Sequence, residues 1–409
     1  MKLKSLLFGS AAILAVGSGA QAADLPMAEP VDYVRICDAF GTGFYYIPGT
    51  DTCLKVGGRV RVEAHYVFGD DEEGGGDGFF ESGTDDEAFN NYTTRARGYV
   101  YLDARTQTDI GLVRAYISML MTVGPAESSV DDGDEVANYA GTGSTLEQAF
   151  VQISNDMGTF TAGHTASFFD FWGSNGFGTR IGIDDNTTES TLFAYTFGAG
   201  NGISATLSLE DPASAGRRLN GDDEGYEGQE YPDVVANIRI DQGWGAAQIM
   251  GVLHDVHHSA TGFDEHEMGW AVGAGLSLTV PGIGAAFNMQ AGYAEGAIGY
   301  ISNDLGGIGD INDDGDLNTA WNVRAGLNAD FTDTIGASID ASYTHVEEAD
   351  DFDEYDLWGV AGTIYYTPVS GLLIGAEVAY NNIDIDSEID ADDDQDDIWG
   401  VMVRVQRTF

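Results

Sequence analysis

The stretch that decides the fold is DIWGVMVRVQRTF, residues 397–409, in which apolar residues alternate with polar or small ones. Successive side chains of a β-strand point to opposite sides, so the pattern predicts a strand with one apolar face. Phe409 is in register with that face, where a membrane barrel places an interfacial aromatic residue. We therefore expect the closing strand of a barrel, because lipid does not tolerate unpaired sheet edges. The apolar face comprises Trp399, Val401, Val403, Val405 and Phe409, and the other face Gly400, Met402, Arg404, Gln406 and Thr408.

The first 22 residues have the layout of a secretory signal peptide. Lys2 and Lys4 precede an apolar run at 6–16, and Ala-Gln-Ala at 20–22 supplies the small residues of a cleavage site. No later stretch offers the roughly 18 apolar residues that a membrane helix needs. The sequence therefore predicts export to the periplasm, the medium or the outer membrane.

Composition indicates one large all-β domain at residues 54–409, because 56 glycines accompany short, even alternation. The net charge of −50 excludes a nucleic-acid binder, which would need basic patches. The acids fall mostly between the alternating segments, whereas arginines lie within them. On the less apolar face of barrel strands, arginines indicate a water-filled lumen. They are Arg59, Arg61, Arg95, Arg97, Arg114, Arg239, Arg324 and Arg404.

Sixteen alternating segments are joined by short and long connections in strict succession. The short ones carry the Asn, Asp, Gly and Pro of tight turns, and the long ones are acidic. Outer-membrane barrels have short periplasmic turns and long external loops, so we predict a 16-stranded antiparallel transmembrane β-barrel. Turns are expected at 105–109, 155–158, 199–202, 241–244, 280–283, 331–334 and 367–371, and loops at 69–88, 124–144, 165–189, 211–231, 259–265, 302–318, 349–353 and 386–396.

Alternation is clean in some segments and poor in one. At 234–240 it places Asn237 and Arg239 in the lumen, and at 335–344 it places the apolar residues toward lipid. The segment at 244–254 alternates poorly, so the sequence does not fix its register.

Two stretches resemble the general-diffusion porins of alphaproteobacteria: DYVRICDAFGTGFYYIPGTDTCLKVGGRVRVE at 32–63 and GTFTAGHTASFFDF at 158–171. With the signal layout and Phe409, the resemblance covers essentially the whole mature chain. It implies a homotrimer in outer-membrane lipid and lipopolysaccharide, passive diffusion of small hydrophilic solutes, and no enzymatic activity or cofactor. Phe409 would then be an assembly signal for the barrel-assembly machinery. The acidic external loops exceed the family's pattern, which leaves the solute preference open.

Cys37 and Cys53 are the only cysteines, and in an exported protein they are predicted to be bonded. We expect the segment 23–53 to form a structural staple at the periplasmic end of the first strand. A redox role would require closer spacing.

The loop at 165–189 is unlike the other loops, because it is rich in aromatic residues and glycine. An exposed loop is the alternative, but Phe168, Phe169, Phe171 and Trp172 would then form a costly apolar patch. We therefore predict a constriction loop, the third, folded into the lumen.

Its acids Asp184, Asp185 and Glu189 would face a basic wall across a narrow aqueous gap, an arrangement that tunes passage through pores. The acidic external loops raise the cation concentration within a Debye length, about 8 Å at physiological salt. The pore is therefore predicted to prefer cations. The basic wall comprises Arg59, Arg61, Arg95, Arg97, Arg114 and Arg404.

Two metal sites are further hypotheses. The oxygen spacing of a calcium loop is repeated by Asp310, Asn312, Asp314 and Asp316, although Trp321 stands where a bidentate Glu belongs. A solvated acidic turn is the alternative. A histidine group at the rim has the ligand type of a transition-metal site or is a wet loop; it comprises His254, His257, His258 and His266.

Other function classes stay open. An outer-membrane hydrolase needs a nucleophile system beside histidine, and Asp255 with His254 offers one without a supporting motif. A structural barrel or adhesin would have a plugged lumen, and a substrate-selective channel is a closer alternative to general diffusion.

Overall fold

A computed structural model describes residues 35–69, 92–125, 140–178, 182–217, 230–258, 265–282, 284–302, 309–312, 316–347, 354–386 and 394–409 of the 409-residue chain. The chain divides into Met1–Arg35 and Ile36–Phe409, and the second unit contains every element named below. The predicted signal peptide and much of the predicted external loops lie outside the described residues. Within the described residues, no helix is long and apolar enough to cross a membrane.

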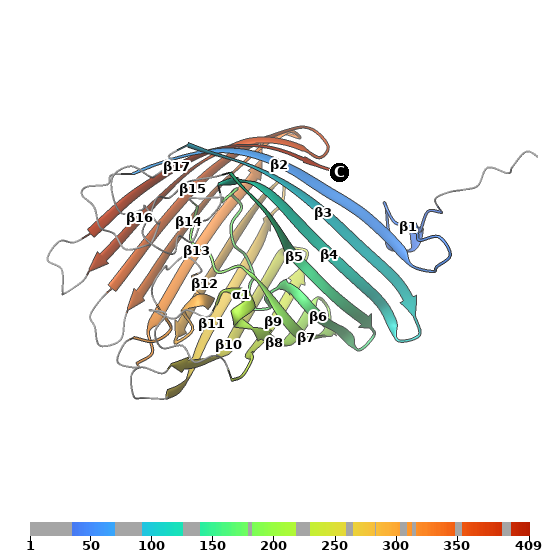
Figure 1. Cartoon of the computed structure of the whole chain (residues 1–409), viewed down its shortest axis with the longest axis horizontal. Coiled ribbons are helices and arrows are strands. Elements are labelled where there is room, and N and C mark those ends of the chain that lie inside the picture. Colours follow the sequence, from blue (N-terminus) through green and yellow to red (C-terminus); the bar gives the residue numbers. More distant parts are fainter. Residues whose placement is uncertain are drawn as a thin grey trace, which may run out of the picture. The chain divides into compact units, whose positions relative to one another are not determined.

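Sixteen antiparallel strands, β2–β17, form one closed sheet (Figure 1). Each strand pairs with the next along the chain, and β17 pairs with β2, which confirms the predicted closing role of the C-terminal strand. The strands are β2 (Cys53–Gly69), β3 (Tyr92–Thr108), β4 (Gly111–Pro125), β5 (Ala140–Asn155), β6 (Gly158–Ala166), β7 (Glu189–Gly200), β8 (Ile203–Asp211), β9 (Asp233–Gln242), β10 (Gly245–His258), β11 (Glu265–Val280), β12 (Ala285–Glu295), β13 (Thr319–Asp330), β14 (Ile335–Glu347), β15 (Glu354–Val369), β16 (Leu372–Asp386) and β17 (Asp394–Thr408). The remaining elements are short: η1 (Asp38–Phe40), β1 (Tyr45–Tyr46), α1 (Pro212–Ala215) and η2 (Ile298–Tyr300).

Phe409 completes the closure beyond β17. Its N–H donates to the Gly58 carbonyl oxygen and its own carbonyl accepts from the Gly58 N–H, both at 3.0 Å. The Phe409 ring lies over Gly58, where a Cβ would come within 2.5 Å of the ring. Glycine at this position therefore lets the aromatic ring pack against the first strand.

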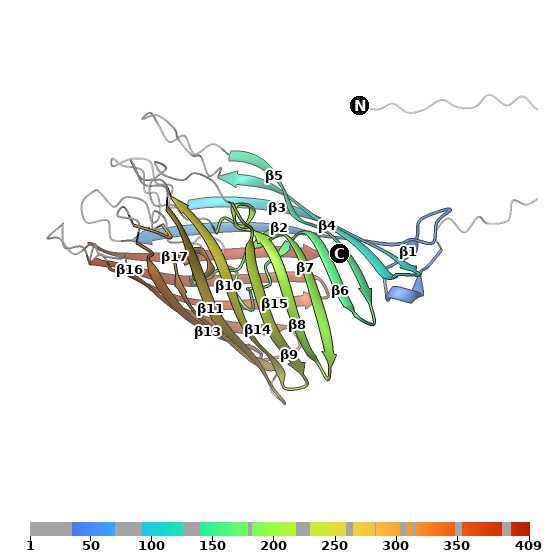
Figure 2. The ribbon, with the colours of Figure 1, turned by 90° about the horizontal axis from the view of Figure 1, so that it is seen from below.

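The seven short turns lie at the end of the barrel that also holds Phe409 and β1 (Figure 2). All seven occur close to the predicted positions, although β3 continues to Thr108 and β15 to Val369, beyond the predicted starts of their turns at residues 105 and 367. Gly245 begins β10 with a positive φ of 139°, and a Cβ there would lie 1.9 Å from the Ser277 carbonyl oxygen. Such turns therefore depend on glycine.

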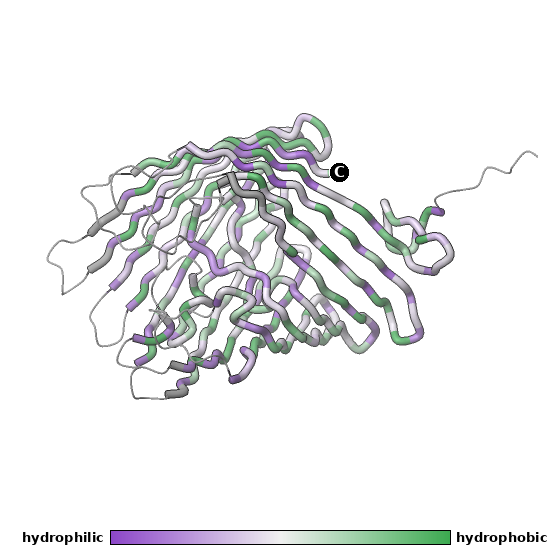
Figure 3. Tube along the Cα trace, in the orientation of Figure 1, coloured by the Kyte–Doolittle hydropathy of each residue, from purple (hydrophilic) through white to green (hydrophobic). Residues whose placement is uncertain are grey.

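The two faces of the sheet differ in polarity, and hydropathy alternates along the strands (Figure 3). On β14, Ile335 and Ile339 are 39% and 57% exposed on the outer face, whereas Ser338 and Asp340 are buried on the inner face. This inverts the arrangement of a soluble protein, because lipid solvates the outer face. The predicted faces of residues 234–240, 335–344 and 397–409 are confirmed.

Poor alternation in β10 has a physical cause. Its inner face carries the apolar Met250 and Val252, both buried. They belong to a core inside the barrel that includes Phe169 of the third long connection, together with Ile298 and Tyr300 of η2. Where a strand faces packed protein and not water, inward residues become apolar and the period-two signal weakens.

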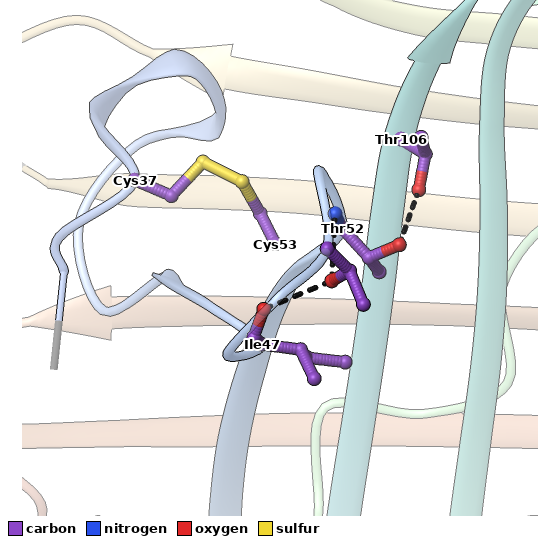
Figure 4. The surroundings of a disulfide bond; sticks show 6 residues. Cys37, Ile47, Thr52, Cys53 and Thr106 are labelled. Carbon is purple, nitrogen blue, oxygen red and sulfur yellow. Dashed lines mark hydrogen bonds between the residues drawn. A yellow bond between two sulfur atoms is a disulfide. The ribbon is translucent and has the colours of Figure 1, made fainter. Parts of the chain in front are cut away.

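The Cys37–Cys53 disulfide confirms the predicted pairing, with a Cα–Cα distance of 6.0 Å (Figure 4). The bond joins the segment before β1 to the start of β2, and both cysteines pack with Phe44. Beside it, the Thr52 hydroxyl is hydrogen-bonded to that of Thr106 on β3 at 3.0 Å. The staple therefore fixes the N-terminal segment to the turn end of the first two barrel strands.

Candidate functional site

The third long connection, described at residues 167–178 and 182–188, lies against the inner face of the barrel and is termed the inward loop (Figure 1). Its first half crosses lumen-facing side chains of successive strands. The Phe168 N–H donates to Glu210 on β8 (3.0 Å), and the Trp172 N–H donates to Oε1 of Gln290 on β12 (2.9 Å). The predicted inward folding is therefore confirmed. Further donors to the loop carbonyls are Asn237 to Phe168, Gln248 to Asp170 and Arg324 to Trp172.

Two wall carboxylates hold the tip of the inward loop. Asp340 on β14 accepts from the N–H groups of Asn175 (2.9 Å) and Gly176 (2.8 Å) and from the Asn175 side-chain amide (2.7 Å). Glu377 on β16 accepts from the N–H groups of Phe177 and of the glycine after it. Such charge-assisted hydrogen bonds are roughly twice as strong as neutral ones. Sequence reasoning missed both roles; the only signal was an isolated acid on the inner face of a strand.

The second half of the inward loop returns over β13 and β14, and Asp184 is its anchor. The carboxylate is 1% exposed and accepts hydrogen bonds from Ser302 (2.6 Å), Asn322 (3.2 Å) and the Thr344 hydroxyl. The Asp184 N–H donates to Ser342 Oγ at 2.9 Å. This corrects the predicted placement: Asp184 binds the wall beneath the loop and does not face the arginines across open water.

The other two predicted acids also lie apart from the predicted basic wall. Asp185 is partly exposed, and its Oδ1 accepts from the N–H (2.7 Å) and hydroxyl (2.6 Å) of Thr187. Glu189 is the first residue of β7, not a loop residue, and lies beside Gln148 of β5. Neither acid forms an ion pair with a described arginine. A transverse field across the lumen stays a prediction, with Asp185 as its remaining acid.

A buried ion pair, also missed from sequence, secures the base of the inward loop. Arg217, just after α1, is fully buried and donates to Asp170, to Ser167 Oγ (2.6 Å) and to the Asn186 carbonyl oxygen (2.7 Å). Its guanidinium stacks 4.2 Å from the Tyr300 ring centroid. Burial raises the pKa of Asp170 to about 6 while Arg217 opposes the rise, so the carboxylate is mostly ionised at neutral pH.

The opposite side of the lumen, on β17 and β2–β4, carries the predicted wall arginines, which all point inward; we term it the arginine wall. Its hub is Glu63, 1% exposed, another residue that the sequence analysis did not identify. Its carboxylate binds Arg404 (2.5 Å), Arg95 (2.7 Å) and Arg61 (3.1 Å). Arg404 also donates to the Phe177 carbonyl oxygen (3.1 Å), so this predicted pore residue is a buried link between the wall and the loop tip.

Two arginines of this wall have no carboxylate partner among the described residues. Arg59 stacks 3.8 Å from the Tyr99 ring centroid, and Arg97 lies directly opposite Arg61 in the β2–β3 register. The other predicted wall residue, Arg114, shares Asp103 with an arginine of β3 and is hydrogen-bonded to Gln152. The wall therefore presents an excess of guanidinium groups to the lumen.

His254 is buried in an ionic network and does not resemble a catalytic base. Its Nδ1 lies 2.8 Å from Asp233, and its Nε2 lies 3.4 Å from Asp310. The Tyr300 hydroxyl donates to Asp233 at 2.5 Å, and the Ile298 N–H donates to Asp310 at 2.7 Å. Both ring nitrogens are engaged, so the alternative of a hydrolytic role for this histidine finds no support.

The candidate metal sites fall partly outside the described residues. Asp314 and the side chains of His258 and His266 are not among the parts of the chain that the structure describes. Asn312 and Asp316 bind each other through Asn312 Oδ1 and the Asp316 N–H at 2.8 Å. Within the described part of the chain, no three His, Cys, Asp or Glu side chains are arranged to hold a metal. Calcium and transition-metal binding stay predictions.

A closed sixteen-stranded barrel with an apolar outer face, a polar lumen and a loop folded against its inner wall defines a channel of the outer membrane. The family model described as "Porin subfamily" matches residues 24–402, and the chain belongs to this family. It is similar to Porin Omp2b of Brucella suis, 31% identical over 430 residues, and to Porin Omp2b of Brucella neotomae, 30% identical over 417, with all of each chain covered. The protein is therefore an outer-membrane porin and not an enzyme.

Solved structures support the same fold. The outer membrane channel DcaP of Acinetobacter baumannii has a TM-score of 0.66 at 19% identity, covering 89% of this chain and 99% of its own. An anion-selective porin from Comamonas acidovorans has a TM-score of 0.52 at 11% identity, covering 88% and 100%. These identities establish the architecture only, so selectivity has to be argued from the residues of this chain.

Proposed function

We propose that this porin passes small hydrophilic solutes and ions by passive diffusion and prefers cations at low salt. The observation that carries the proposal is the location of charge. The described lumen exposes guanidinium groups on the arginine wall, whereas acids such as Asp184 and Asp340 are buried beneath the inward loop. Cation preference must then come from the acidic external loops, which carry most of the −50 charge in sequence.

Salt should screen the acidic external loops at the mouth of the pore more readily than the arginine wall inside the lumen. The Debye length falls from about 8 Å at 0.15 M to about 3 Å at 1 M, so the mouth charge is screened before contacts at the arginine wall are. Reversal potentials across potassium chloride gradients should indicate cation preference at low salt and a shift toward anions at high salt. Anion preference at low salt would refute the proposal.

We further propose a homotrimer whose subunits meet at β4–β10. Nine consecutive strands, β11–β17 with β2 and β3, carry outward aromatic residues near the loop end, in contacts such as Tyr343–Trp358 at 4.3 Å and Tyr380–Trp399 at 4.8 Å. Aromatic residues of this kind mark the interface between lipid and water. On β4–β10 this signature is weaker: Phe193 of β7 is an exposed outward aromatic residue, but seven other outward residues near the loop ends are not aromatic. They are Val123, Ser144, Ala166, Thr191, Asp211, Val234 and Leu253.

Matched tryptophan substitutions test the subunit interface. Leu207→Trp on β8 should lower the yield of heat-resistant trimer, because a larger side chain disturbs a packed interface. Val360→Trp on β15 should leave that yield unchanged, because lipid accommodates the ring. Leu207 and Val360 are 57% and 41% exposed in the single chain. Equal trimer yields for the two variants would contradict the proposed arc.

Export and assembly complete the proposal. Residues 1–22 act as a cleaved signal peptide, so N-terminal sequencing of the membrane form should begin at Ala23. Phe409, which pairs with Gly58 at the closing seam, serves the barrel-assembly machinery as a signal. Deleting Phe409 should lower the trimer content of membranes; an unchanged content would count against this role.

A further inference from the structure

Three guanidinium groups meet on β2 and β3 in a way that general diffusion does not require. Arg61 is directly opposite Arg97, and Arg59 is directly opposite Tyr99, one lumen-facing position further along. Side chains in directly opposed positions have Cβ atoms about 5 Å apart, and like charges placed so are destabilising. The pairing therefore needs a compensating negative charge.

Among the residues that the structure describes, no carboxylate is paired with Arg97 or Arg59 to supply that charge. Both oxygens of Glu63 are engaged: Oε1 by Arg404 (2.6 Å) and Oε2 by Arg95 (2.9 Å). Another wall acid, Glu147, accepts a hydrogen bond from Ser118 at 2.5 Å. No ion pair joins Arg59 or Arg97 to a carboxylate within the described residues.

The arginines also present unused donors in fixed positions. The Nε atoms of Arg59 and Arg97 are buried and lack hydrogen-bond partners among the described atoms, whereas the Nε atom of Arg61 lies 3.1 Å from Glu63 Oε1. The stack of Arg59 on Tyr99 holds one guanidinium plane, and the Arg61–Glu63 contact of 3.1 Å holds a second. A guanidinium fork matches the paired oxygens of carboxylate, phosphate or sulfate.

We infer that Arg59, Arg61 and Arg97 form a binding site for a small oxyanion that carries two negative charges, such as a dicarboxylate, phosphate or sulfate. A dianion supplies compensating negative charge and enough oxygen atoms to accept hydrogen bonds from the three guanidinium groups. The site goes beyond the proposed diffusion, which needs no affinity. Such anions should occupy the arginine wall and slow the ion current saturably.

Planar-bilayer recording of the purified full chain tests the site. Succinate, phosphate or sulfate is added in turn to either side at constant ionic strength, with chloride as the reference anion. Each bound dianion should reduce the current with a saturating concentration dependence. A saturating effect of succinate alone assigns the site to dicarboxylates, and an effect of all three assigns it to oxyanions in general. A linear, non-saturating effect of all three overturns the site.

Variants separate a site from a general charge effect. Arg97→Gln should weaken the dianion effect roughly tenfold or more, because charge-assisted hydrogen bonds are lost. Arg239→Gln is the matched control: Arg239 is inward-facing and loses the same charge, but it is paired with Asp241 at 2.9 Å on β9. Equal weakening by both variants would overturn the site.

Arg97→Lys keeps the charge and removes the fork. It should weaken dianion binding severalfold, and unchanged binding would overturn the geometric assignment. Reversal potentials in potassium chloride, measured in the same membranes, report cation preference separately. Failure of the proposed selectivity and failure of the dianion site are therefore distinguishable.

Discussion

The two sides of the lumen use charge in opposite ways. On the arginine wall the side chains outnumber their acids, and Arg59 and Arg97 have no described carboxylate partner. On the side from β8 to β16, the acids Glu210, Asp340 and Glu377 are buried beneath the inward loop and accept its backbone N–H groups. One side therefore presents excess positive charge to the lumen, and the other holds a loop in place.

This difference teaches that the charge of a lumen-facing residue does not by itself define its role. The role depends on which groups cover the residue. Asp184 and Arg404 both lie inside the barrel, yet Asp184 accepts hydrogen bonds from wall hydroxyl and amide groups, and Arg404 joins Glu63 to the loop tip. The experiments below separate anchoring charges from exposed ones.

The largest effect is expected from removing both tip anchors. Asp340→Ala with Glu377→Ala removes charge-assisted hydrogen bonds to four consecutive loop residues, 175–178. At about 1.5–3 kcal/mol for each acid, the loop tip loses roughly 3–6 kcal/mol of docking free energy. Single-channel conductance should rise severalfold as the tip leaves the wall. Ser338→Ala is the control and should conduct normally, because this buried hydroxyl on the inner face of β14 has no hydrogen-bond partner among the described residues.

The buried pair at the base of the loop ranks next. Arg217→Met leaves Asp170 charged, buried and unpaired, which costs about 3–5 kcal/mol. Hydrogen exchange of the loop amides should report a fall of this size in the free energy of local opening. The double variant Arg217→Met with Asp170→Leu removes both charges and should recover much of it. If the single variant exchanged like wild type, the pair would not be an anchor.

The barrel could be predicted from the sequence because the alternation within strands and the turn residues are local patterns. Ile335 to Thr344 alternate in sequence as they do between lipid and lumen, and the turns carry their own glycine chemistry. Phe409 was readable as the closing residue for the same reason. The wall arginines also followed, since parity within a strand fixes which face they share.

The anchoring contacts could not be predicted in this way. Asp184 finds Ser302, Asn322 and Thr344 between 118 and 160 positions away, so no local pattern pairs them. Glu63 has the same parity as Arg61 on β2, but parity cannot reveal that Arg404, 341 positions away, shares the same carboxylate. Contacts between distant segments depend on the closed topology as a whole.

A smaller effect is expected from removing the Cys37–Cys53 disulfide, which lies at the turn end of the arginine wall. Cys37→Ser with Cys53→Ser should cost about 3 kcal/mol in the chain-entropy model for a loop of this length. The bond holds Phe44, whose ring lies 5.0 Å from the Arg105 guanidinium, at the turn end of the wall. Unfolding in guanidinium should occur at lower concentration, whereas ion selectivity should stay unchanged. Non-reducing mass spectrometry of wild type checks the linkage itself, and free thiols at both positions would contradict it.

The smallest and most informative effect concerns the two neighbouring acids of the inward loop. Asp185 is partly exposed, so Asp185→Asn should shift the reversal potential slightly toward anions and leave conductance unchanged. Asp184 is 1% exposed, so Asp184→Asn should loosen the loop, with noisier open-channel current, and scarcely alter selectivity. Both changes remove one negative charge, which makes each the control for the other. Equal shifts of the reversal potential would mean that net charge alone governs the lumen, and the distinction between anchoring and exposed charges would fail.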